Sequence, residues 1–123
     1  MMKKFAGIAF LASVFVYFSC GMGPEKRIQG LWKAKYVTEG SDTLNIDLST
    51  TQLTFKPDGQ YAYSGNLNYR ESGVFHIKGH YLYTTDDSTK KEKAVEILLL
   101  EADTLILHME ENTLDRVMRL ERE

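Results

Sequence analysis

The side chains of Trp32 and Arg116 could either contact a bound molecule or pack in the core of the fold. Trp32 is expected to fill the core rather than contact a ligand, because large aromatic side chains dominate core energetics. Arg116 alternates with Met118 and Leu120, so it points inward if those two residues are core. Three roles follow for Arg116: stacking on Trp32, anchoring a ligand carboxylate, or extending to solvent at a rim.

Aromatic residues supply the other candidates. Tyrosines recur at positions 61, 63, 69, 81 and 83. Tyrosines around a small cavity give apolar walls with polar tips, which suits an amphipathic ligand, although such a set more often forms core and rim. The residues expected to line the interior of the fold or a ligand site are Trp32, Tyr36, Phe55, Tyr61, Tyr63, Phe75 and Arg116.

Neither a catalytic site nor a metal centre is predicted. The sequence has no nucleophile elbow, glycine-rich phosphate loop or metalloprotease helix. His76 and His80 flank a turn and His108 stands apart, with no cysteine or carboxylate evidently beside them. The carboxylates are interpreted as solvated surface. We therefore expect a protein that is not an enzyme and needs no cofactor.

Cys20 is the one cysteine of the chain, and it follows a targeting signal. Lys3 and Lys4 form a basic start, and an apolar run covers 5–18. A spanning helix needs about 20 apolar residues, so this run is better read as the hydrophobic part of a signal peptide. It resembles a bacterial lipoprotein signal over 1–19, with Cys20 as the lipidated residue. The alternative is ordinary secretory cleavage that leaves a buried free thiol.

The charge of the chain argues against a nucleic-acid partner. The formal net charge is −2, and without Lys3 and Lys4 it falls to −4, because 13 basic residues face 17 acidic ones. Nucleic-acid binding needs a basic face, which a mildly acidic domain does not favour.

A complete β-hairpin is predicted around the tripeptide Pro-Asp-Gly at 57–59. Proline presets the first corner, aspartate can bond back to the backbone, and glycine accepts the left-handed conformation that closes a three-residue loop. This turn pairs Phe55 with Tyr61 and Leu53 with Tyr63, so all four side chains share one face.

Short alternating strands and tight polar turns continue to the end of the chain. Gly-His at 79–80 suits a two-residue turn that pairs Ile77 with Leu82, whereas a three-residue turn pairs Phe75 with Tyr81. About eight strands, with turns every 8–12 residues or so, indicate a sandwich or barrel. Sequential hairpins favour an up-and-down barrel, whose closure removes the exposed edges.

Three parts of the chain follow from these patterns: a signal peptide over 1–19, a tether with a short helical turn over 20–29, and an all-β antiparallel barrel of eight to nine strands over 30–123. Residues 44–48 alternate apolar with polar residues and form either a further strand or an ordered lid.

Several short motifs resemble those of the bacterial lipocalin-like lipoproteins, over most of 30–119. They are Gly30-Leu31-Trp32, the hairpin Leu-Thr-Phe-x-Pro-Asp-Gly-x-Tyr, Gly73-Val74-Phe75 before Ile77-x-Gly79, and a last strand with Arg116. The resemblance implies a calycin-type barrel open at one end. It also implies that Trp32 closes the floor and that a late-strand arginine packs across it.

The function expected from this resemblance is non-covalent binding of a small apolar or amphipathic ligand. The protein is expected in the bacterial cell envelope, held to the outer membrane or its periplasmic face by lipid on Cys20. The alternative is a filled barrel that docks another envelope protein through a Leu98/Leu100 face and the 44–48 segment.

Overall fold

The computed structural model describes residues 23–111 and 113–123. The predicted signal peptide and Cys20 lie outside these residues. The elements are α2 (Pro24–Arg27), β1 (Gly30–Glu39), β2 (Asp42–Thr43), β3 (Gln52–Phe55), β4 (Gln60–Ser64), a 3₁₀ turn η1 (Asn66–Asn68), β5 (Arg70–Lys78), β6 (Tyr81–Asp86), β7 (Glu92–Leu100), β8 (Thr104–Glu111) and β9 (Leu114–Arg122). Within the described residues, no helix has the length and apolar character needed to cross a membrane.

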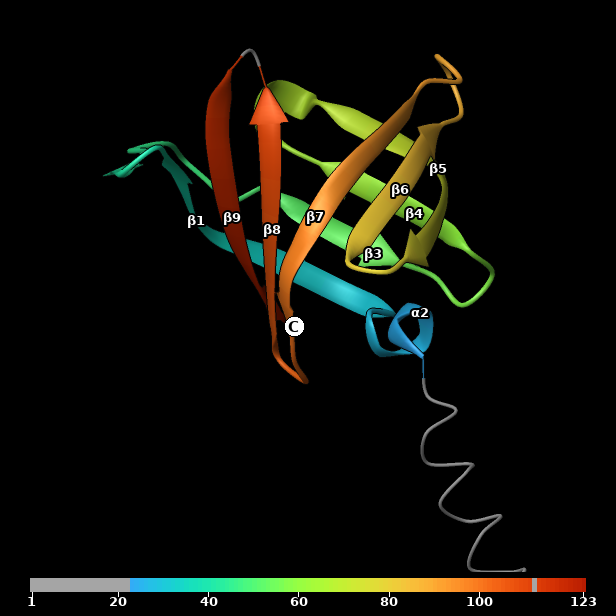
Figure 1. Cartoon of the computed structure of the whole chain (residues 1–123). Coiled ribbons are helices and arrows are strands. Elements are labelled where there is room, and N and C mark those ends of the chain that lie inside the picture. Colours follow the sequence, from blue (N-terminus) through green and yellow to red (C-terminus); the bar gives the residue numbers. More distant parts are fainter. Residues whose placement is uncertain (1–22, 112) are drawn as a thin grey trace, which may run out of the picture.

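The strands form a closed antiparallel barrel (Figure 1). Each of the strands β3 to β8 pairs with the next one along the chain, and β1 pairs with both β3 and β9. These eight strands therefore close the sheet on itself, which removes its exposed edges. The two-residue strand β2 pairs with the last two residues of β1 and brings the number of strands to nine. The predicted up-and-down barrel of eight to nine strands is confirmed.

The hairpin of β3 and β4 has the predicted register. Leu53 pairs with Tyr63 and Phe55 with Tyr61. Gly59 has a φ of 85°, in the left-handed region that its place in the turn requires. The Asp58 carboxylate accepts a hydrogen bond from the Gln60 amide at 3.1 Å. The local turn chemistry thus sets the pairing of the two strands.

The β5–β6 hairpin uses the two-residue turn. Ile77 pairs with Leu82 and Phe75 with Thr84, and Gly79 has a φ of 63°. Because a shift of one residue would reverse the faces of β6, this turn decides that Leu82 and Thr84 face the interior. Both are buried.

A β-bulge in β1 overturns one sequence prediction. Tyr36 was expected inside with Trp32 and Ala34, but the register with β9 shifts between Ala34 and Tyr36. The extra residue turns the following side chains over, since strand faces alternate with every residue. Val37 is buried in the core and Tyr36 is 40% exposed on the outside. Tyr36 is therefore not an interior residue.

A second bulge lies in β7, between Ile97 and Leu99. Leu98 is exposed there, whereas Leu100 packs against the core. The Leu98/Leu100 face that the interaction alternative required is therefore not formed, because the bulge puts the two side chains on opposite sides of the sheet.

The two ends of the barrel differ. The helix α2 packs at the end that carries the β3–β4, β5–β6 and β7–β8 turns, as Figure 1 shows. The backbone amide of Ile77 donates to the Glu25 carboxylate at 3.0 Å, which fixes α2 to β5. We refer to this end as the closed end. The opposite end carries the 44–51 loop, η1 and the β6–β7 turn, and we refer to it as the open end.

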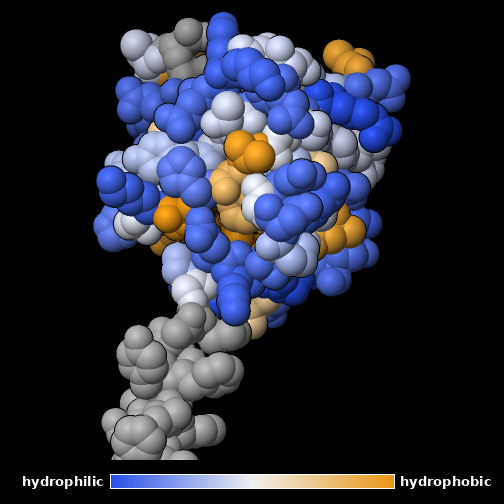
Figure 2. Space-filling view, turned by 90° about the vertical axis from the view of Figure 1, so that its right-hand side faces the viewer, coloured by the Kyte–Doolittle hydropathy of each residue, from blue (hydrophilic) through white to orange (hydrophobic). Residues whose placement is uncertain are grey.

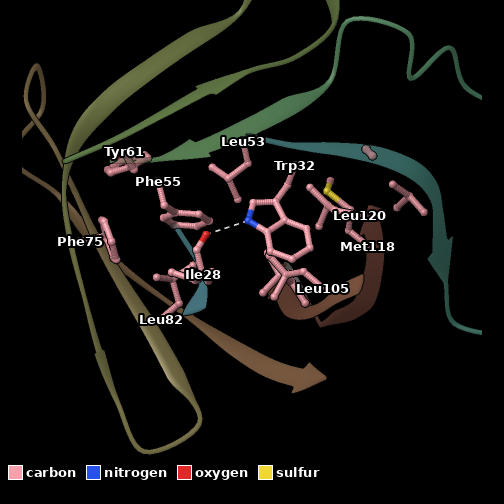
Figure 3. Packing of buried hydrophobic residues seen from close by; sticks show 13 residues of the cluster. Ile28, Trp32, Leu53, Phe55, Tyr61, Phe75, Leu82, Leu105, Met118 and Leu120 are labelled. Carbon is pink, nitrogen blue, oxygen red and sulfur yellow. Dashed lines mark hydrogen bonds between the residues drawn. The ribbon is translucent and has the colours of Figure 1, made fainter. Parts of the chain in front are cut away.

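The hydrophobic core includes a group of large side chains packed around Trp32 (Figure 3). Phe55 and Phe75 meet edge to face with their ring centroids 4.8 Å apart. Such aromatic pairs add stability beyond the area they bury. The largest fully buried side chains are Trp32, Phe55, Ile28, Leu82, Leu105 and Leu120.

Candidate functional site

Trp32 forms the floor of the barrel. Its side chain is fully buried, and its Nε1–H donates a hydrogen bond to the Ile28 carbonyl at 2.8 Å (Figure 3). Ile28, which follows α2, is itself fully buried. The indole therefore has both an apolar environment and the hydrogen-bond partner that a buried N–H requires. Its position is that of a core plug.

Arg122 covers this floor. Its guanidinium carbon lies 4.3 Å from the centroid of the Trp32 ring, in a cation–π contact. The same guanidinium donates to the carbonyls of Ala102 at 2.6 Å and Arg27 at 2.7 Å, and also to the carbonyl of Gln29. One side chain thus joins the β7–β8 turn, the end of α2 and the tryptophan.

Of the three roles left open for Arg116, stacking on Trp32 is not the one observed. Trp32 stands near the start of β1 and pairs with Arg122, whereas Arg116 pairs with Glu39 at the other end of β1. Arg116 and Arg122 share a strand face, so alternation alone does not separate them. The antiparallel pairing of the first and last strands does, because it brings the start of one against the end of the other.

Gly30 is required for this arrangement. It has a φ of 128°, and a Cβ atom there would lie 2.6 Å from the Arg122 Nη1 atom. A side chain at this position would strain the backbone and displace the guanidinium. The Gly-x-Trp motif therefore combines a tryptophan that plugs the floor with a glycine that makes room for the arginine.

A cavity of about 310 Å³ occupies the open half of the barrel. Most of its wall is aliphatic, and the residues that form this apolar part include Leu53, Leu82, Val95, Leu107, Met109 and Met118. Trp32, Phe55 and Phe75 do not line it, since they fill the closed end. A concave, mostly apolar site with a few polar groups is the usual form of a small-molecule site.

A carboxylate lies in the cavity wall. Glu71 accepts hydrogen bonds from the Tyr61 hydroxyl at 2.5 Å, the Tyr69 hydroxyl at 2.7 Å and the Lys93 ammonium at 3.0 Å. The Glu71 side chain is only 7% exposed, whereas that of Lys93 is 57% exposed. A buried carboxylate is tolerated when it is paired and hydrogen-bonded, and Glu71 is both.

The pKa values of these groups follow from their contacts. Burial acts to raise the pKa of Glu71, but the hydrogen bonds from Tyr61, Tyr69 and Lys93 outweigh it, so this pKa lies below its usual value. Burial and the bond to Glu71 raise the pKa of Tyr61. The bond to Glu71 raises the pKa of Tyr69 to about 12. At neutral pH the Glu71 carboxyl is therefore ionised and the two phenols are neutral.

Arg116 lies at the mouth of the cavity. Its Nε–H donates to the Glu39 carboxylate at 2.9 Å, and its side chain is partly exposed. Of the three roles considered for Arg116, the observed position matches a residue at the rim of the barrel.

The 44–48 segment covers part of the mouth as an ordered loop rather than a strand. Leu44 and Leu48 pack against the core and line the cavity with Ile46. The Leu44 amide donates to the Val37 carbonyl at 2.8 Å, and the Asp47 carboxylate accepts from the Ser49 amide at 2.9 Å. Of the two sequence alternatives, the ordered lid is the observed one.

Comparison with known proteins agrees with this architecture. No protein-family model and no curated protein matches the sequence. Among solved structures, the chain is similar to a lipocalin-like protein from Bacteroides uniformis ATCC 8492, with a TM-score of 0.57 and 12% sequence identity. The match covers 76% of this chain and 97% of that one. The chain has a lipocalin-like fold.

The lipocalin-like barrel separates the predicted site residues into two groups. Phe55 and Phe75 lie in the closed-end core with Trp32, and Tyr61 and Tyr63 line the cavity.

Neither Glu71 nor Lys93 was predicted as a site residue. The carboxylates were interpreted as solvated surface. For Glu71 that interpretation was wrong. Its position alternates with Gly73 and Phe75, which are buried, and Lys93 alternates with Val95. Strand periodicity could therefore have placed both charged residues on the interior face.

The histidines lie away from the cavity. The His76 ring stacks on Tyr83, with their centroids 4.9 Å apart. His108 contacts the carboxylates of Glu96 and Asp115 at 3.0 and 3.1 Å. Within the described part of the chain, no group of three or more histidine, cysteine or acidic residues is arranged to hold a metal ion.

Proposed function

We propose that the open half of this lipocalin-like barrel binds a small apolar or amphipathic molecule without covalent chemistry. The observation that carries the proposal is the cavity of about 310 Å³, open at one end, with mostly aliphatic walls. Sites of roughly 300–1,000 Å³ with such walls are typical for small ligands. No catalytic step is part of the proposal.

The alternative, a filled barrel that docks another envelope protein, has less support. It predicts a solid interior and a continuous apolar patch outside. Leu44 and Leu48 pack inward, and the β7 bulge separates Leu98 from Leu100. The face in Figure 2 is largely hydrophilic, with separate hydrophobic patches.

Filling the cavity tests the proposal. Val95 lines the cavity, so the Val95→Trp variant should lose most of its affinity for the neutral fluorescent probe N-phenylnaphthylamine. Val74→Trp is the matched control, because Val74 is 51% exposed on the outer wall. It should bind the probe like the parent.

Two results would contradict the binding proposal. One is a folded parent that does not bind the probe at all, and the other is equal loss of binding in both tryptophan variants. Native mass spectrometry of the protein purified from its own cells is the complementary measurement, because it can detect a co-purified ligand directly.

We further propose that lipid on Cys20 holds the protein in the cell envelope. The support is the sequence signal before Cys20. Pro24 and the rest of α2 lie at the closed end. An anchor three residues before Gly23 would therefore place the closed end nearest the membrane, with the mouth directed away from it.

Metabolic labelling with a palmitate analogue tests this anchor. The parent should incorporate the label and fractionate with membranes, and the Cys20→Ser variant should do neither. Label retained in Cys20→Ser would overturn the proposal.

A further inference from the structure

The charges of the cavity wall are already compensated by one another. Glu71, Lys93 and Arg116 are the charged residues among those described that line the cavity. The Lys93 ammonium lies 3.0 Å from the Glu71 carboxylate, and the Arg116 Nε lies 2.9 Å from the Glu39 carboxylate. Each of the two cations therefore already has a carboxylate in contact.

An ionised ligand group inside this cavity would lack a free partner. Glu71 accepts three hydrogen bonds from protein donors. A ligand ammonium would have to compete with Lys93 for it, and a ligand carboxylate would stand beside it as a like charge. Burying a charge without a compensating partner costs far more than burying a neutral polar group.

Neutral hydrogen-bonding groups, by contrast, are available. Tyr63 and Asn66 belong to the lining residues, and neither side chain has a hydrogen bond to another residue described in the structure. Burial raises the pKa of Tyr63, so its hydroxyl stays protonated and can donate. Together they offer donors and acceptors to an alcohol, ester or amide.

From this arrangement we propose that the cavity selects neutral amphipathic ligands, with an apolar body and an uncharged hydrogen-bonding end, over fatty acids and alkylamines of the same length. The inference rests on the proposed binding function and names its ligand class. The paired wall charges act as specificity-determining groups, since removal of either member of the Glu71–Lys93 pair creates an uncompensated charge.

Three ligands of equal chain length provide the first test. Decanol, decanoate and decylamine are titrated against the parent protein near neutral pH by displacement of N-phenylnaphthylamine. Decanol should bind at least about tenfold more tightly than either ion, which is the effect of leaving one polar group unpaired. Equal affinities, or tighter binding of decanoate, would overturn the inference.

Two variants should switch this preference in opposite directions. Lys93→Met leaves the Glu71 charge without its partner, so the affinity for decylamine should rise relative to that for decanol. Glu71→Gln leaves the Lys93 charge without its partner, so the affinity for decanoate should rise relative to that for decanol. Lys91→Met is the matched control, because it removes the same charge from an exposed position outside the cavity lining, and its order of affinities should equal that of the parent.

The outcomes separate this inference from the function on which it rests. If the parent protein does not bind the probe, the binding function itself is wrong. If the probe and decanol bind but neither variant changes the ranking of the ions, the binding function stands and the neutral selection is wrong. Circular dichroism of each variant confirms that a lost signal does not come from unfolding.

Discussion

The closed and open ends of this barrel are built from the same strands and have opposite characters. At the closed end, Trp32, Ile28 and Phe55 fill the interior, and Arg122 covers the tryptophan and donates hydrogen bonds to three backbone carbonyls. At the open end, aliphatic side chains surround a cavity of about 310 Å³, and the charged groups face one another in pairs.

This difference indicates that the closed end stabilises the fold, whereas the open end forms the cavity. Dense packing of large side chains supplies stability, whereas a cavity forfeits packing contacts that the surrounding atoms could otherwise make. The closed end can therefore support an open end that is not optimised for stability. The predictions below test whether the two ends divide in this way.

The largest effect is expected at the floor. Trp32→Ala should lower the free energy of unfolding by about 3–5 kcal/mol, because it removes a fully buried aromatic side chain. Urea unfolding followed by circular dichroism measures it. Tyr36→Ala is the control on the same strand, and it should cost less than about 1 kcal/mol, since Tyr36 lies outside the barrel. Similar losses of stability in the two variants would contradict both the core position of Trp32 and the outward position of Tyr36 after the bulge.

Two arginines of β9 provide the next comparison. Arg122→Met should cost about 1.5–3 kcal/mol, because it removes the cation–π contact and leaves carbonyls of Ala102, Arg27 and Gln29 without their donor. Arg116→Met removes a part-exposed ion pair at the mouth and should cost less than about 1 kcal/mol. The same urea titrations measure both variants. A larger loss of unfolding free energy for Arg116→Met would contradict the proposal that the closed end contributes more to stability than the open end.

The smallest effect concerns Glu71. Its pKa is lowered in the folded state, so its ionised form stabilises the fold above the ordinary value of 4.5, and this contribution is lost as pH falls through the folded value. Glu71→Gln should cost about 1–2 kcal/mol at neutral pH. The difference between parent and variant should shrink toward acid pH. A difference that is constant from neutral to acid pH would show that the ionised carboxylate is not the stabilising form.

Turn chemistry made much of the fold predictable. The Pro-Asp-Gly tripeptide at 57–59 fixes the pairing of Phe55 with Tyr61, and Gly79 fixes the pairing of Ile77 with Leu82. These registers depend on φ angles and hydrogen bonds within a few residues, so the sequence contains the information locally.

The candidate site was less predictable. Tyr61 and Tyr63 were identified as candidate lining residues, but the cavity also depends on Glu71 and Lys93, which stand on different strands. A charged side chain on an interior face is stable only with its partner in place. Sequence alternation can put each residue inside, yet it does not show that the two meet.

The amino-acid sequence by itself thus determined an all-β fold of sequential hairpins, the register of the β3–β4 hairpin and a core position for Trp32, because alternation and turn residues act over short distances along the chain. Only the tertiary structure decided that Tyr36 faces outward, that Arg122 rather than Arg116 covers the floor, and that Glu71 is buried beside Lys93. A bulge adds a residue without a local signal, and closure of the barrel joins strands from opposite ends of the chain. Both therefore depend on long-range pairing.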